Sequence, residues 1–236
     1  MSREADLDRL YELLIDLEDR VSGKHRLKSC TGYLDWPKRG VYFLFAHDEY
    51  RDTDDQHRLT RIGTHAVSSG SGASLWSRLH AHRGANSGTY AGGGNHRGSV
   101  FRKHIGKALI ERHNLHAEHP YWGDGSSADP NQRLNEHDLE RQVSDHIRDL
   151  PFLWIDVEDE PGPDSDRAYI EQNAIALVSN FEKDGLDRRN SDWVGAESPR
   201  QEIRNSGLWN INHVNGDYDS AFLDRVAEAV KDTTPV

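Results

Sequence analysis

The apolar residues of this chain repeat at two different intervals, which separate predicted helices from predicted strands. Spacing of three and four positions runs over residues 6–21, with charged residues between, and indicates an amphipathic helix. Helical spacing returns after Ser74, after Ser99 and in the stretch "RAYIEQNAIALVSNF", and both serines are suitable helix N-caps. Two more helices are predicted from the stripes Leu139, Val143 and Ile147, and Phe222, Leu223, Val226 and Val230.

Three further stretches have the pattern of strands. The run "VYFLF" follows Gly40 and precedes acidic residues, so we expect a strand over residues 40–46 that is buried on both faces. Residues 58–63 alternate weakly and end at Gly63, as the partner strand of a hairpin would, and "PFLWIDVED" predicts a strand over 152–157. The segment "SGLWNINHV", residues 206–214, is a candidate edge strand, and residues 114–135 have the composition of a loop.

Length and composition favour a single globular domain and exclude several other classes of protein. A length of 236 residues is enough for one well-cored domain, and we expect residues 1–236 to form a single one. The only cysteine, Cys30, excludes an intrachain disulfide and a thiolate zinc site. No apolar run is long enough to cross a bilayer, and the charged N-terminus lacks the pattern of a signal peptide. We therefore expect a cytoplasmic protein without a membrane partner.

Four short motifs occur in a suggestive order along these elements. They are Gly40-Val41-Tyr42, then Ile62-Gly63, then a helix bearing Arg78, then a helix bearing Glu171 within "IEQNAI". In this order they resemble the GIY-YIG nuclease family. The resemblance covers residues 38–182, with an insertion at 84–150 and terminal extensions at 1–37 and 183–236. It implies an α+β fold, in which helices flank a small antiparallel sheet of three strands.

The resemblance also implies site residues and one departure from the family pattern. Arg61 stands where the second tyrosine of the motif would be, and we expect His65 to take over part of that role. The family pattern makes Tyr42 the general base, Arg78 the ligand of the phosphate, and Glu171 the ligand of Mg²⁺ or Mn²⁺. An ordinary phenol has a pKa of about 10, so Tyr42 would need nearby cations to ionise.

Two histidines are natural partners or competitors of Tyr42, because imidazole titrates near neutral pH. His82 lies one helical turn from Arg78, and His65 follows Gly63 by two residues. We expect both to support the reaction by hydrogen bonds to the attacking water, to Tyr42 or to the phosphate. An ordinary solvated helix face is the alternative explanation of the Arg78 and His82 pair.

The stretch "GGGNHRGSVFRK" is the most basic part of an acidic chain, whose net charge is −11. Glycines permit close approach of the backbone, and a helix that begins near Ser99 would present free N–H groups to a phosphate. We expect this stretch to contact the nucleic-acid backbone, with a plain flexible loop as the alternative. The expected nucleic-acid ligands are Arg61, Arg97, Arg102 and Lys103.

These observations predict a metal-dependent endonuclease that hydrolyses DNA. Because the chain is acidic as a whole, substrate choice should depend on a shaped site or on a partner, either a second copy of the chain or another protein. Arg61 favours a different function, that of a catalytically silent nucleic-acid-binding module. Two further hypotheses are a histidine-rich metal site in a non-nuclease hydrolase, built from His113, His116 and His119, and an interaction scaffold that uses the terminal helices.

Overall fold

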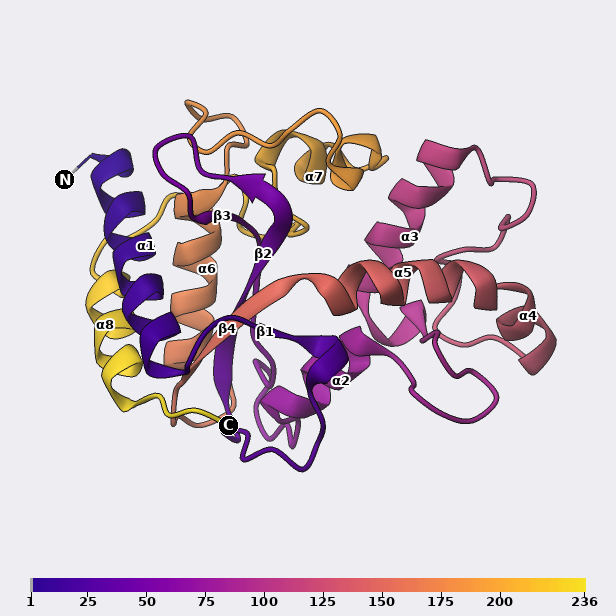
Figure 1. The fold of residues 1–236 in the computed structure, drawn as a ribbon, viewed down its shortest axis with the longest axis horizontal. Helices are drawn as coiled ribbons and strands as arrows, with labels where there is room; N and C mark the ends of the chain where they lie inside the picture. The colour runs from indigo at the N-terminus through magenta and orange to yellow at the C-terminus, as the bar shows by residue number, and fades with distance from the viewer. Residues whose placement is uncertain (1) are drawn as a thin grey trace.

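The computed structural model describes residues 2–236 and has helical layers on both sides of a sheet. On one side, α1 (Arg3–Arg20) packs on α8 (Phe222–Asp232), and both contact α6 (Asp166–Val178). Figure 1 shows these three helices side by side at the left, although α1 and α8 come from opposite ends of the chain. The predicted amphipathic helices at 6–21 and at the C-terminus are therefore present, and their apolar stripes face each other.

The sheet has four antiparallel strands, in the order β1-β4-β2-β3. Strands β2 (Gly40–Tyr50), β3 (His57–Gly63) and β4 (Pro151–Asp156) correspond to the three predicted ones. The expectation of three strands was wrong, because β1 (His25–Arg26) pairs with β4 at the edge. A strand of only two residues is too short to give a recognisable sequence pattern. The α+β class is confirmed.

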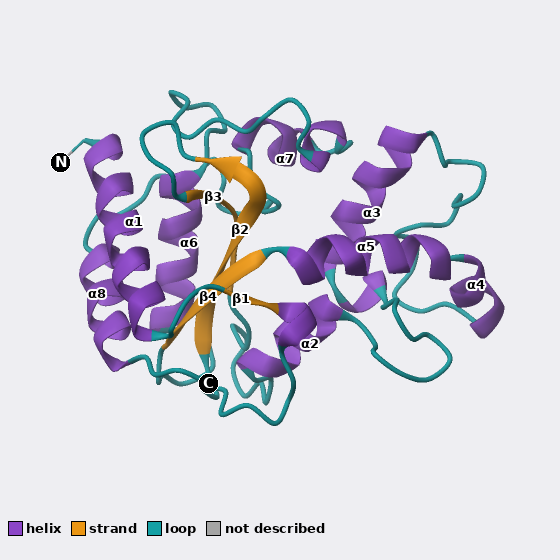
Figure 2. Ribbon diagram, viewed as in Figure 1, coloured by secondary structure: helices purple, strands orange, loops and turns teal. Residues whose placement is uncertain are grey.

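The other side of the sheet carries an arm built mainly from residues 84–150, the range predicted to be an insertion. It contains α2 (Leu75–Arg83), α3 (Val100–His113), α4 (Pro130–Asn135) and α5 (His137–Asp149). In Figure 2, α3, α4 and α5 lie at the right, and α2 lies below the centre. The side chains of Ser74 and Ser99 cap α2 and α3, as predicted. Helix α4 lies within the predicted loop, so that part of the prediction was wrong. It has no buried residue and therefore no apolar stripe, although Asp129 caps it and Pro130 opens it.

Residues 207–214 do not form the predicted strand. They follow α7 (Gln201–Ser206) as an irregular segment that covers the outer edge of β3. The amide of Trp209 donates to the Thr60 carbonyl at 2.7 Å, and the Asn210 side chain bonds both the N–H and the carbonyl of Ile62. An amide side chain thus satisfies the strand edge where a neighbouring strand would otherwise be needed.

Three short 3₁₀ helices complete the fold, at Leu27–Ser29, His96–Gly98 and Val194–Glu197. Cys30 is buried. Over residues 2–236, no helix combines the length and the apolar character that crossing a bilayer requires.

Candidate active site

Tyr42 and Gly63 are direct cross-strand partners in β2 and β3. The phenol ring lies over the glycine, where any Cβ would overlap the Tyr42 hydroxyl. Glycine is therefore needed at position 63 to make room for the aromatic ring. The two halves of the sequence motif, 21 positions apart, form one structural unit.

His82 approaches this unit from the last turn of α2. Its Nε2 is 2.9 Å from the Tyr42 hydroxyl, and its Nδ1 is 2.8 Å from Ser99 Oγ at the start of α3. Tyr42 and His82 are both fully buried. Burial, reinforced by Arg61, Arg78 and Arg102, holds the pKa of His82 well below its usual value. The imidazole is thus neutral at pH 7 and can donate from one nitrogen while it accepts at the other.

Arg61 also points to the Tyr42 hydroxyl. Its Nε donates to the phenol oxygen at 3.4 Å, and its Nη1 donates to the Trp209 carbonyl at 3.1 Å. The guanidinium lies over the ring of Phe101, 4.6 Å from its centroid. The residue that replaces the second tyrosine of the motif therefore brings a positive charge to the first.

Glu171 of α6 reaches the end of β3. Its Oε1 accepts a hydrogen bond of 3.1 Å from the Thr64 amide, directly after Gly63, and within residues 2–236 its Oε2 accepts none. Burial raises the pKa of Glu171, and Arg61, the Thr64 amide, His213 and Arg78 oppose that rise. The carboxylate lies in the field of two arginines yet forms no ion pair with any described residue. No sequence motif pointed to His213, whose exposed side chain comes from the irregular C-terminal segment.

Arg78 lies half-buried beside a cavity of about 340 Å³. Its Nε is buried and has no hydrogen-bond partner in the described part of the chain. The cavity is lined by Thr64, by Ser77 and by His65, among other residues. A buried guanidinium nitrogen without an acceptor is costly, so this arrangement suits an anion that enters from the cavity.

His65 lines the same cavity but makes no hydrogen bond to Tyr42 or Glu171. Its Nε2 is 3.2 Å from the Lys38 carbonyl, and its own carbonyl accepts from the Arg167 guanidinium. Burial, and next the charge of Arg167, lowers the pKa of His65 to about 4. The structure thus places His65 near Arg78, apart from the hydrogen bonds that join Tyr42, His82 and Arg61.

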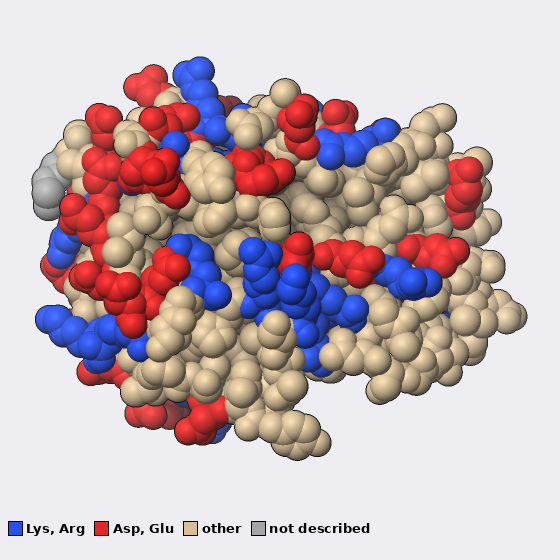
Figure 3. Space-filling model, in the orientation of Figure 1, with Lys and Arg blue, Asp and Glu red and all other residues tan. Residues whose placement is uncertain are grey.

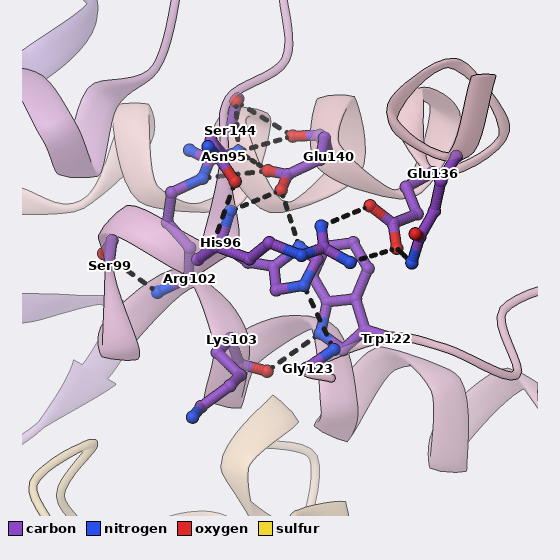
Figure 4. A network of polar contacts seen from close by, with 12 residues as sticks. Asn95, His96, Ser99, Arg102, Lys103, Trp122, Gly123, Glu136, Glu140 and Ser144 are labelled. Atoms are coloured by element: carbon purple, nitrogen blue, oxygen red, sulfur yellow. Dashed lines mark hydrogen bonds and ion pairs between the residues drawn. The ribbon is translucent and has the colours of Figure 1, made fainter. Parts of the chain in front are cut away.

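Two arginines of the basic stretch near Ser99 form ion pairs within the arm. Arg97 forms a two-pronged ion pair with Glu136, and the guanidinium of Arg102 is fully buried against Glu140 (Figure 4). A Cβ at Gly94 would overlap that guanidinium, so the glycine serves close internal packing. The expected contact of Arg102 with a nucleic-acid backbone is therefore not available here. Lys103 remains partly exposed, and its ammonium has no described partner.

The hypothesis of a metal site at three histidines is contradicted. Helix α3 ends at His113, and Asn114 turns the chain with a left-handed conformation, so His116 and His119 do not continue one helix face. His116 pairs instead with Glu111. Among residues 2–236, no group of three or more histidine, cysteine or acidic side chains could hold a metal ion.

Comparison with known proteins gives one match. A family model described as the GIY-YIG domain matches residues 1–236, the whole chain. Neither the curated proteins nor the solved structures gave a match.

Proposed function

The chain belongs to the GIY-YIG nuclease family, and from that premise we propose that it is a metal-dependent endonuclease that hydrolyses DNA phosphodiester bonds. One observation carries the proposal. Arg61 donates to the Tyr42 hydroxyl, Glu171 accepts from the Thr64 amide, and Arg78 lines the cavity beside Thr64. None of these three partly or wholly buried charges forms an ion pair with a described residue.

Unpaired charges of this kind lower the stability of a folded protein unless a ligand compensates them. A phosphodiester supplies the anion that the two arginines lack, and a divalent cation supplies the charge that Glu171 lacks. Clustered, perturbed ionisable groups are typical of functional sites. The charge pattern therefore fits a phosphate and a metal bound side by side.

Each side chain has a role that follows from its position. Tyr42 accepts the proton of the attacking water once its phenol is ionised, and donors from Arg61 and His82 stabilise the phenolate. Arg78 binds a phosphoryl oxygen and stabilises the charge that develops in the transition state. The Tyr42 hydroxyl is enclosed in the free protein, so we expect the substrate phosphate to compete for Arg61 and uncover it.

A single carboxylate suits Mg²⁺ or Mn²⁺, since these hard ions keep several waters and often bind only one or two protein ligands. Glu171 would hold the ion through the oxygen that accepts no hydrogen bond, while Thr64 fixes the other oxygen. When bound, the ion would neutralise phosphoryl charge and assist the leaving 3′ oxygen.

Net charge bears on how the substrate is chosen. The chain carries −11, and the face in Figure 3 shows acidic side chains over much of its left part, with basic side chains gathered most densely near the centre and scattered elsewhere. Long-range attraction to DNA is therefore weak. We expect selection by the shape of the site, or by a second protein or a second copy of this chain.

A catalytically silent nucleic-acid-binding module is the second candidate function. Arg61 favours it, because an arginine cannot reproduce a tyrosine hydroxyl at that position. Such a module would retain the phosphate-binding arginines and bind DNA without cutting it.

Cleavage of supercoiled plasmid and of short duplexes, at several Mg²⁺ and Mn²⁺ concentrations, tests the proposal. The wild type is compared with Glu171→Ala, with Tyr42→Phe and with Glu12→Ala, a substitution on the exposed face of α1. We expect metal-dependent cleavage that both site variants lose and Glu12→Ala retains. Binding in a gel-shift assay without cleavage by the wild type would support the silent module and contradict the nuclease.

A further inference from the structure

His82 is held by its backbone as well as by its ring. Its carbonyl accepts a hydrogen bond of 2.8 Å from Nη1 of the fully buried Arg102. This carbonyl belongs to the last turn of α2, where carbonyl groups have no partner within the helix. Arg102 therefore completes the end of the helix that bears the proposed site histidine.

The first turn of α3 contacts His82 at two points. Ser99 Oγ bonds the Nδ1 of the ring, and the same oxygen accepts from the backbone N–H of Arg102 as the helix cap, at 3.3 Å. Arg102 then reaches the carbonyl. Ring and backbone of His82 are thus fixed to one rigid element, with little freedom for the imidazole to rotate away from Tyr42.

Glu140 of α5 fixes Arg102 in turn. Its Oε2 accepts from Arg102 Nε at 2.9 Å and from Nη2, and Nη2 also donates to Ser144 Oγ and to the Glu140 carbonyl. Figure 4 shows the guanidinium enclosed by these acceptors. All three guanidinium nitrogens of Arg102 are used, so its direction is determined by the arm and not by solvent.

The other carboxylate oxygen of Glu140, Oε1, is also hydrogen-bonded. Oε1 accepts from the backbone N–H of His96 at 2.6 Å and lies 2.9 Å from His96 Nδ1. Nε2 of His96 accepts from the Gly123 amide, which leaves the ring proton on Nδ1, and the ring of Trp122 stacks on the imidazole. The carboxylate is fully satisfied in one orientation.

We propose that Glu140 and Arg102 are positioning residues that hold His82 Nε2 against the Tyr42 hydroxyl, so that the insertion acts as a rigid support of the site. The inference rests on the proposed function only where it concerns catalysis. The order of contacts, from Glu140 through Arg102 to His82 and Tyr42, exists in the free protein. Neither positioning residue touches substrate.

The chain offers a matched control for this pair. Arg97, just before α3, and Glu136, the N-cap of α5, form a second buried arginine–glutamate pair with contacts of 2.6 and 2.9 Å. This second pair makes no contact with His82. Glu136→Gln should thus disturb the arm in a similar way without moving the histidine.

The test compares Glu140→Gln and Glu136→Gln with the wild type. Because Glu140→Gln leaves a buried charge unpaired, the double variant Arg102→Met with Glu140→Gln is added. It removes both charges and keeps an acceptor for His96. The first readout is the nuclear magnetic resonance spectrum of ¹⁵N-labelled histidine, in which His82 is assigned from the signals missing in His82→Asn. The second is the rate of plasmid cleavage, separated into kcat and KM.

We expect the His82 ring nitrogen signals to move in Glu140→Gln and in the double variant, and to stay in place in Glu136→Gln. With cleavage, kcat should fall about 10- to 100-fold at nearly constant KM in the same two variants only. Unchanged His82 signals in the folded double variant would overturn the inference. If the wild type does not cleave DNA, the proposed function fails, and the His82 signals alone decide the positioning role.

Discussion

Glu140 in the arm and Glu171 beside the sheet are both largely buried, yet their surroundings differ in kind. At Glu140, burial favours the neutral acid, but hydrogen bonds from His96 and the charge of Arg102 outweigh it, and the pKa is lowered. At Glu171, burial dominates over Arg61, Thr64, His213 and Arg78, and the pKa is raised. The carboxylate of Glu140 is thus ion-paired within the arm, whereas that of Glu171 forms no ion pair with any described residue.

The difference separates charges that are paired within the fold from charges that have no ion-pair partner among the described residues. A closed pair such as Glu140 and Arg102 has no capacity left for a substrate. Glu171 and Arg78 each keep an unused polar atom, Oε2 in one case and the buried Nε in the other. A basic stretch in a sequence therefore says less about phosphate binding than the absence of internal partners in the structure does.

The sharpest contrast is in stability. Glu140→Gln leaves Arg102 as an uncompensated buried charge and should lower the free energy of unfolding by about 3–5 kcal/mol. Glu171→Gln removes a charge that burial disfavours and should leave the stability at pH 7 equal or higher. Urea unfolding followed by circular dichroism measures both. Equal losses of unfolding free energy in the two variants would contradict the distinction between the ion-paired carboxylate of Glu140 and the unpaired carboxylate of Glu171.

Arg78 should matter to catalysis much more than to folding. If Arg78 binds the phosphate as we propose, Arg78→Ala removes a donor to the transition state, and the cleavage rate should fall about 10²- to 10³-fold. Its guanidinium has no acidic partner, so the unfolding midpoint should change little. Arg225→Ala, which removes an exposed arginine on α8, serves as the control and should retain wild-type cleavage. Normal cleavage by Arg78→Ala would remove the phosphate-binding role.

The two glutamates should also give opposite pH dependence, an effect expected to be smaller. The folded pKa of Glu171 lies above its unfolded value of 4.5, so ionisation reduces stability as pH rises through the folded pKa. Glu171→Gln should therefore become more stable than the wild type as the pH rises through the folded pKa. This difference in stability should vanish below pH 4.5. For Glu140 the folded pKa is lower, so the wild-type advantage over Glu140→Gln is present above pH 4.5 and lost as pH falls through the folded pKa.

Unfolding midpoints of the wild type and the two glutamine variants, measured between about pH 3 and pH 7, check the signs. If the unfolding midpoints of the two variants depended on pH in the same way, the assignment of an unpaired carboxylate at Glu171 and a paired one at Glu140 would be contradicted.

The smallest expected effect compares two helix caps. Ser74 caps α2 and Ser99 caps α3, and replacement of either by alanine should lower stability by about 1 kcal/mol. Only Ser99 also contacts His82, so Ser99→Ala should slow cleavage and Ser74→Ala should not. Thermal unfolding and plasmid cleavage on the same preparations give both values. Equal cleavage by the two variants would remove the contribution of Ser99 to the site.

Much of the fold could be predicted because its signals are local. The apolar runs of β2 and β4 and the serine caps of α2 and α3 need only their own residues to be recognised. Strand β1 depends on pairing with β4, more than a hundred positions away, and residues 207–214 cover β3 through a side-chain amide, which no strand pattern describes.

The candidate site could be recognised in the sequence only in part. Tyr42, Gly63, Arg78 and Glu171 are recognisable in order along the chain, and the register of β2 and β3 brings the first two together. The burial of Arg102 could not be foreseen, since its partner Glu140 lies 38 positions later on another helix. Sequence composition cannot distinguish an arginine that faces solvent from one enclosed by a distant carboxylate.

The central claim is our proposal that the carboxylate of Glu171, which has no ion-pair partner among the described residues, holds the metal ion that cleavage of DNA requires. The most direct test is the rate of Mg²⁺-dependent plasmid cleavage by Glu171→Gln, on protein whose unfolding free energy has been measured. The account predicts a stability at least equal to that of the wild type and a rate lower by about 10³-fold, since a bound metal contributes several kcal/mol to transition-state stabilisation. Cleavage at the wild-type rate by the folded variant would contradict it.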